Sequence, residues 1–186
     1  MKHRLDVGAG VVAVVFAVVV AVLATGSPAA ASHSDQADGN DTRGVLDVAT
    51  VFHRHDAVPP SWEVVTFARW TPGSIWDAGY ILVWIDTLGD ERPDYYALVR
   101  STGRGVAGSL WRDRRRKDAF VARLRTTRGN QRSVRVAVPF RKMEIGDHRT
   151  IYRWSAQTIL TGGPCSRPCF DLVPDGGAQV EESLTT

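Results

Sequence analysis

The chain has 186 residues, with 23 Lys and Arg against 20 Asp and Glu and a formal net charge of +3. Charges this evenly balanced do not by themselves predict a nucleic-acid partner. The length predicts one domain with a single hydrophobic core. The sequence contains no G-x-S-x-G, H-E-x-x-H or Walker motif, which are the marks of several common enzyme classes.

Residues 1–31 predict a secretory signal peptide. A basic start at residues 2–4 precedes an apolar run that ends at Leu23, and three alanines at 29–31 supply the small residues of a cleavage site. An uncleaved membrane anchor is the alternative, because the run approaches the ~20 residues that span a bilayer. The polar segment that follows favours cleavage after Ala31. We therefore expect a secreted or cell-envelope protein without membrane attachment.

The rest of the chain predicts an all-β fold between two flexible ends. Residues 32–44 form a polar leader and residues 176–186 a tail, and both are expected to be flexible. Residues 45–175 predict a single antiparallel β-sandwich or jelly roll of about eight strands, because runs rich in Val, Ile, Thr and aromatic residues alternate with turn residues. The predicted strands are 45–53, 62–70, 80–86, 95–101, 106–111, 119–126, 133–138 and 150–160.

Two of these strands have informative side-chain patterns. Val134, Val136 and Val138 alternate with polar neighbours, which predicts a strand with one buried face. The strand at 80–86 is apolar on both faces, which predicts a central position in the sheet.

The two cysteines, Cys165 and Cys169, predict a disulfide in an exported chain. Pro164 and Pro168 fit the turn that must bring the two Cα atoms within bridging distance. A redox pair is the alternative, but C-x-x-x-C spacing disfavours it, and a zinc site would need further His or Cys ligands nearby.

Four carboxylates gather in the connection between two predicted strands: Asp86, Asp90, Glu91 and Asp94. The segment resembles the acidic loops of exported bacterial proteins, some of which hold calcium, an ion that prefers several oxygen ligands. Leu88 stands where such a loop has its second acid, so the alternative is a turn whose Asp side chains bind their own backbone. The same aspartates are candidates for a hydrolase, which needs two carboxyl groups roughly 5–9.5 Å apart in a cleft.

Trp62, Trp70 and Trp76 are the candidate ligand-binding residues, because exposed aromatic rings in a row suit sugar binding. Trp62 and Trp70 are an even number of positions apart on one predicted strand and should share a face. Trp76 lies near a loop, where its ring is expected to be exposed. The alternative is core packing, since rings of this size dominate core energetics.

Two further clusters have a functional and a structural interpretation. His53, His55 and Asp47 share one strand face and could bind a metal, although such a group is also common at a strand end. Residues 112–118 contain five cations and two aspartates at an expected hairpin tip. This run could meet phosphate-rich wall polymers or nucleic acid, but most charge runs are solvated loops, and we expect no nucleic-acid partner.

Five short segments form a recognisable set: LDVA at 46–49, the acidic connection at 85–95, VPF at 138–140, YRWSA at 152–156 and CSRPCFDLVPD at 165–175. With them the chain resembles a group of exported bacterial proteins and, more distantly, family 9 carbohydrate-binding modules and DOMON-type domains. The resemblance implies a β-sandwich. It also implies sugar binding between aromatic rings and structural calcium, which are features of family 9 modules.

The leading hypothesis is a non-enzymatic, exported module that binds cell-envelope polysaccharide or protein, with calcium as its only expected cofactor. It predicts at least two solvent-facing Trp rings in line, with polar groups nearby. The alternatives are an envelope scaffold protein without a small ligand and a small hydrolase that uses Asp86, Asp90 or Asp94.

Overall fold

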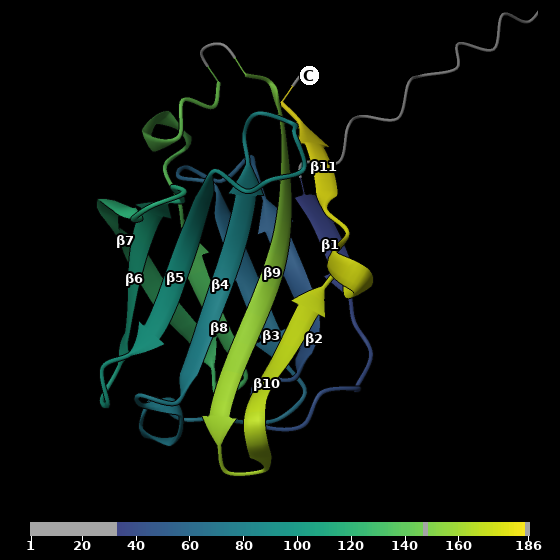
Figure 1. The fold of residues 1–186 in the computed structure, drawn as a ribbon, viewed down its shortest axis with the longest axis vertical. Coiled ribbons are helices and arrows are strands. Elements are labelled where there is room, and N and C mark those ends of the chain that lie inside the picture. The colour runs from purple at the N-terminus through teal and green to yellow at the C-terminus, as the bar shows by residue number, and fades with distance from the viewer. Residues whose placement is uncertain (1–32, 147–148, 185–186) are drawn as a thin grey trace, which may run out of the picture.

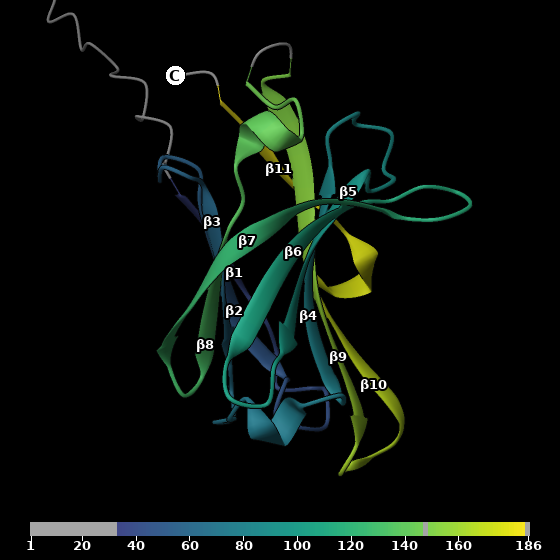
Figure 2. The same ribbon diagram turned by 90° about the vertical axis from the view of Figure 1, so that its left-hand side faces the viewer.

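The computed structural model describes residues 33–146 and 149–184, and they form the all-β fold that the sequence predicts. The expected signal peptide lies outside the described residues. Eleven antiparallel strands join into one sheet, which folds into two layers and nearly closes on itself (Figures 1 and 2). The fold class is therefore confirmed, whereas the number of strands exceeds the expected eight.

Both layers are built from antiparallel neighbours. The first layer runs in the order β1 (His33–Ala37), β2 (Val48–Arg54), β3 (Ser61–Thr66), β8 (Ser133–Ala137) and β7 (Ala119–Asn130). The second layer continues with β6 (Val106–Arg112), β5 (Tyr95–Ser101), β4 (Gly79–Asp86), β9 (Ile151–Gly162) and β10 (Cys165–Val173). β11 (Val180–Ser183) also pairs with β9, beyond the end of β10.

Strand β7 belongs to both layers. Its first half pairs with β6 and its second half with β8, so it carries the sheet from one layer to the other. β6 contributes Gly108 where β7 begins to diverge, and a Cβ atom there would lie 2.5 Å from Cγ2 of Thr126. The absence of a side chain at this position lets the two strands stay close.

The described part of the chain also contains three short 3-10 helices: η1 (Gly73–Ile75), η2 (Phe140–Lys142) and η3 (Asp175–Gly177). None of the helices in the described ranges has the length and apolar character needed to cross a membrane.

The hydrophobic core lies between the two layers. Val134 and Val136 of β8 are buried as their alternation predicts, while Arg135 between them is exposed. β4 lies between β5 and β9, which confirms its central position, and its inward side chains Ile81 and Val83 are each 1% exposed.

A polar seam joins the two open edges of the sheet. The backbone N–H of Val48 on β2 donates to Oδ2 of Asp171 on β10 at 2.6 Å. At the other end, Ser34 on β1 donates its hydroxyl to the Glu182 carboxylate on β11. The expected flexible leader and tail therefore each contain a strand: the backbone of β1 pairs with β2, that of β11 pairs with β9, and the Ser34–Glu182 bond links the two strands across the seam.

The disulfide between Cys165 and Cys169 is formed, with the two Cα atoms 5.7 Å apart. The register of β10 against β9 shifts between these two cysteines, so the disulfide spans the irregular start of β10, next to the turn from β9. The short helix η2 directly follows Pro139.

Candidate functional site

An unbroken row of four aromatic side chains crosses the solvent-facing side of the second layer. We call Trp84, Tyr96, Trp111 and Phe120 the aromatic row; they come from β4, β5, β6 and β7, one per strand. Each is the direct cross-strand partner of the next in the sheet register. Trp84, Tyr96 and Trp111 are half-buried and Phe120 is 54% exposed.

The rings of the aromatic row are in mutual contact. The ring centroids of Trp84 and Tyr96 are 5.1 Å apart, and those of Trp111 and Phe120 are 5.5 Å apart. Tyr96 and Trp111 lie nearly parallel, with 8° between their planes and 6.5 Å between centroids. Because side chains directly opposite on antiparallel strands are neighbours, the sheet register sets this spacing.

Polar neighbours fix the orientation of three of the rings. The indole N–H of Trp84 donates to Gln157 at 3.1 Å, and that of Trp111 donates to Ser109 at 2.8 Å. The Tyr96 hydroxyl donates to Asp118 at 2.8 Å. Burial, and then the Asp118 carboxylate, raise the pKa of Tyr96 to about 12, so this phenol stays a neutral donor near pH 7.

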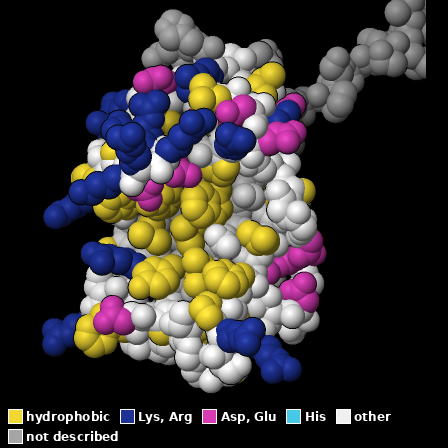
Figure 3. All heavy atoms as spheres, in the orientation of Figure 1, with side chains coloured by type: hydrophobic (Ala, Val, Ile, Leu, Met, Phe, Trp, Pro, Cys, Tyr) yellow, Lys and Arg dark blue, Asp and Glu magenta, His cyan; other side chains and the backbone are white. Residues whose placement is uncertain are grey.

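The aromatic row borders a shallow hollow of about 330 Å³ on the same face. Its lining is mainly apolar, with two carboxylates at one side: Tyr80, Leu82, Trp84, Tyr96, Leu98, Ile159, Asp113 and Asp118. Figure 3 shows the apolar side chains of this face as a continuous yellow area with blue basic side chains around its upper and left edges. Extended exposed apolar surface of this kind typically marks an interaction site.

The structure corrects the expected row of Trp62, Trp70 and Trp76. Trp62 is fully buried and Trp70 is 2% exposed, so neither ring is open to a ligand. β3 ends at Thr66, so Trp70 is not on the strand of Trp62; its ring lies under the guanidinium of Arg128 at 3.9 Å. Trp76 is 60% exposed, as expected near a loop.

The acidic connection after β4 is held together by its own carboxylates. Asp86 is fully buried, and its two oxygens accept the backbone N–H groups of Leu88, Gly89 and Glu91. Asp94 accepts both the N–H and the hydroxyl of Thr87. These bonds match the alternative of a self-bonded turn.

Neither proposed use of the connection gains direct support from this geometry. Asp86 offers no free oxygen to a hydrolase substrate, because backbone donors occupy its carboxylate. Calcium binding through Asp86, Asp90, Glu91 and Asp94 stays a prediction.

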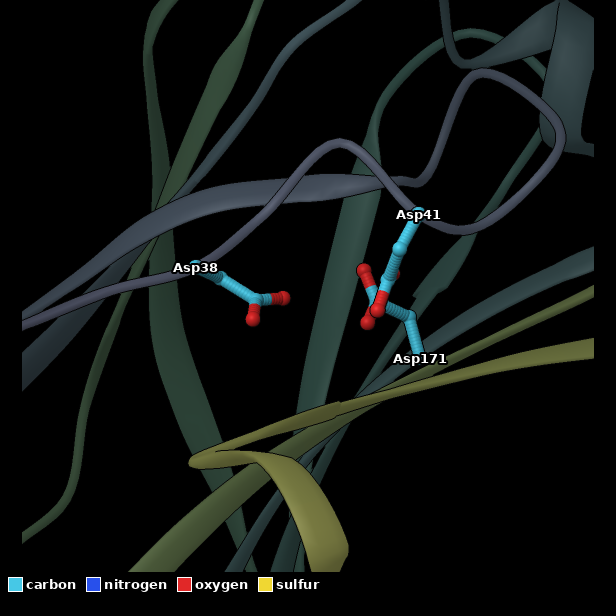
Figure 4. Close-up of side chains that lie close together, drawn as sticks. All are labelled: Asp38, Asp41 and Asp171. Carbon is cyan, nitrogen blue, oxygen red and sulfur yellow. The ribbon is translucent and has the colours of Figure 1, made fainter.

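A different acidic group lies at the seam: Asp38, Asp41 and Asp171, whose carboxylate oxygens come within 4.8 Å of one another (Figure 4). Two of them come from the segment after β1 and the third from β10. Three carboxylates this close could hold a hard cation, although calcium takes 6–8 oxygen ligands. The sequence analysis missed this group because two of its members lie in the expected leader.

The carboxyl groups at the seam bind protons more tightly than usual. Burial, and then the charge of Asp171, raise the pKa of Asp38 from 3.8 to about 7, and Asp175 adds to the effect. Burial also raises the pKa of Asp171, even though the N–H of Val48 opposes this shift. The seam therefore favours a proton on Asp38 at slightly acid pH.

This arrangement predicts a pH-dependent stability. Because the folded state raises the pKa of Asp38 above its unfolded value, its stabilising contribution is complete below pH 3.8 and is lost as the pH rises through about 7. In the presence of a chelator, the melting temperature of the wild type should fall as the pH rises from 3.8 to about 7. The melting temperature of Asp38→Asn should fall less over the same interval. Asp35→Asn on exposed β1 is the control; identical profiles for Asp38→Asn and the wild type would contradict the prediction.

The histidine cluster does not present a free metal ligand at His53. Its Nδ1 donates to the carbonyl of Ser61 at 3.2 Å, which leaves Nε2 to accept the hydroxyl of Tyr152. Burial lowers the pKa of His53 to about 4. Both ring nitrogens are thus occupied, and the ring stacks on Trp62 with centroids 4.1 Å apart.

Comparison of the chain with protein-family models, with curated proteins and with solved structures finds no match. The candidate function therefore has to be argued from the aromatic row and its surroundings.

Proposed function

We propose that this protein is an exported glycan-binding module and that the aromatic row is its binding surface. The observation that carries the proposal is the register: one aromatic ring from each of four adjacent strands forms a continuous line on the solvent-facing side. Sugar rings present flat C–H faces, and a row of aromatic rings offers several such contacts along an extended chain. Secretion and the resemblance to family 9 modules agree with this proposal but stand as expectations.

The polar groups beside the aromatic row support the same proposal. Ligand sites typically combine apolar and aromatic surface with a few polar groups that fix orientation. Gln157, Ser109 and Asp118 already hold three of the rings through hydrogen bonds. The row is therefore ordered before a ligand arrives, which lowers the entropic cost of binding.

The test is affinity electrophoresis against a panel of neutral and acidic polysaccharides. Trp111→Ala should weaken binding about tenfold or more, because it removes one stacking contact and interrupts the row. Trp111→Phe should retain much of the binding, and Trp76→Ala is the control outside the row. If the wild type binds none of the polysaccharides and a protein partner can be isolated, the result would instead favour the envelope scaffold.

A further inference from the structure

The basic connection between β6 and β7 lies at one end of the aromatic row. β6 ends at Arg112 and β7 begins at Ala119, directly beyond the facing pair Trp111 and Phe120. We call residues 112–118 the basic tip. Figure 2 shows this connection projecting away from the second layer, on its outer side.

The basic tip carries uncompensated positive charge. Its five cations are Arg112, Arg114, Arg115, Arg116 and Lys117, and all of them are exposed. None of the five forms an ion pair with another residue in the described part of the chain. A run of like charges in this position repels itself unless an anion is nearby.

The two carboxylates of the basic tip point toward the sheet instead of neutralising these cations. Asp118 accepts the Tyr96 hydroxyl and the backbone N–H of Arg114. Burial, and then the charge of Asp118, raise the pKa of Asp113. Both carboxylates line the hollow beside Tyr96. The guanidinium of Arg112 lies over the ring of buried Tyr95, 5.5 Å from its centroid, so the charge available to a ligand comes from Arg114, Arg115, Arg116 and Lys117.

Two more cations stand at the margins of the same face. Arg100 on β5 is paired in register with Tyr80, and Arg123 on β7 is paired with Ser109. Both are exposed. The apolar surface is thus bordered by positive charge over part of its margin, and Figure 3 shows blue basic side chains at its upper and left edges, with magenta acidic side chains to the right.

We infer that the glycan recognised by the aromatic row is an acidic polysaccharide whose sugar rings carry carboxylates. This inference rests on the proposed function. Sugar rings would stack on the aromatic row while carboxylates of the same polymer meet the guanidinium groups of the tip, which can bind them through two parallel hydrogen bonds. A polymer with a phosphate backbone and no ring in the chain would satisfy the tip but leave the aromatic row without stacking partners.

The test compares sodium polygalacturonate with its methyl-esterified form, which keeps the sugar rings and loses the charge. The wild type should bind the acidic form more tightly, and its affinity should fall with rising salt because exposed charges are screened. The variant Arg114→Gln/Arg115→Gln/Arg116→Gln/Lys117→Gln should lose about tenfold or more of its affinity for the acidic form. It should bind the esterified form as the wild type does.

Matched variants separate the possible failures. Arg141→Gln/Lys142→Gln removes exposed charge elsewhere and should leave binding unchanged. If both polymers bind equally and only Trp111→Ala weakens them, the inference is wrong and the proposed function survives. If Trp111→Ala binds both polymers as the wild type does, the proposed function fails. Equal binding of a DNA duplex, independent of Trp111, would overturn the inference and leave the tip as a general polyanion contact.

Discussion

Replacing Trp62 with alanine is expected to lower the free energy of unfolding by about 3–5 kcal/mol, the usual cost of truncating a buried Trp. The Trp62 ring is fully buried and stacks on His53, and it also contacts Phe140 and Trp154, with ring centroids 6.3 and 6.4 Å away. Its removal leaves a cavity beside His53, Phe140 and Trp154. Urea unfolding followed by circular dichroism measures the change.

The matched control is Trp76→Ala, because Trp76 is the same residue type but is 60% exposed. Surface substitutions usually change stability by less than about 0.5 kcal/mol. A small effect at Trp62, or an equal effect at the two positions, would contradict the assignment of Trp62 to the core.

Replacing Glu182 with alanine is expected to lower the free energy of unfolding by about 2–3 kcal/mol, because it deprives buried donors of a charged acceptor. Its carboxylate accepts the Trp154 indole N–H at 3.2 Å and the Ser34 hydroxyl, and it lies 3.7 Å from Nδ1 of His55. These partners come from β9, β1 and the end of β2, so the substitution should loosen the seam at β11.

The neighbouring residue supplies the control for the seam. Glu181 is exposed and pairs with Arg153 at 3.0 Å, an interaction that is typically worth less than about 1 kcal/mol. Glu181→Ala should therefore be nearly neutral. Amide hydrogen exchange should accelerate in β1 and β11 of Glu182→Ala; if exchange there matches the wild type, the carboxylate does not hold the seam.

The strands with alternating or continuous apolar patterns could be predicted from sequence. β5 lies at the predicted 95–101, and β4 and β8 differ from their predictions by one residue at one end. Their side chains face the core at every second position. The alternation of buried and less buried positions therefore matches the two-residue period of the sequence pattern.

β1 and β11 could not be predicted, because neither carries a buried apolar stripe. β1 reads HSDQA and β11 reads VEES. They are held by backbone pairing with β2 and β9 and by the Ser34–Glu182 bond across the seam. β10 was missed for a related reason. Its first residues were assigned to the expected disulfide turn, and the register shift between Cys165 and Cys169 interrupts the two-residue alternation of its side chains.

The candidate site depends on register, which a single strand does not reveal. Trp84 lies in a strand that is apolar on both faces, and a central position in the sheet was enough to explain that pattern. The sequence therefore offered no reason to assign Trp84 to a binding surface. The outer face of β4 is instead part of the solvent-facing side of the second layer, where Tyr80 and Trp84 are half-buried. Only the pairing of Trp84 with Tyr96, and of Tyr96 with Trp111, turns isolated aromatic residues into the aromatic row.

The most direct measurement is a titration of the six indole N–H signals of the tryptophans by nuclear magnetic resonance, with polygalacturonate oligosaccharides as the ligand. The account predicts that the signals of Trp84 and Trp111 shift with increasing ligand, while those of buried Trp62, Trp70 and Trp154 do not. Shifts confined to Trp76, or no shift of Trp84 and Trp111 with any polysaccharide of the panel, would contradict glycan binding at the aromatic row.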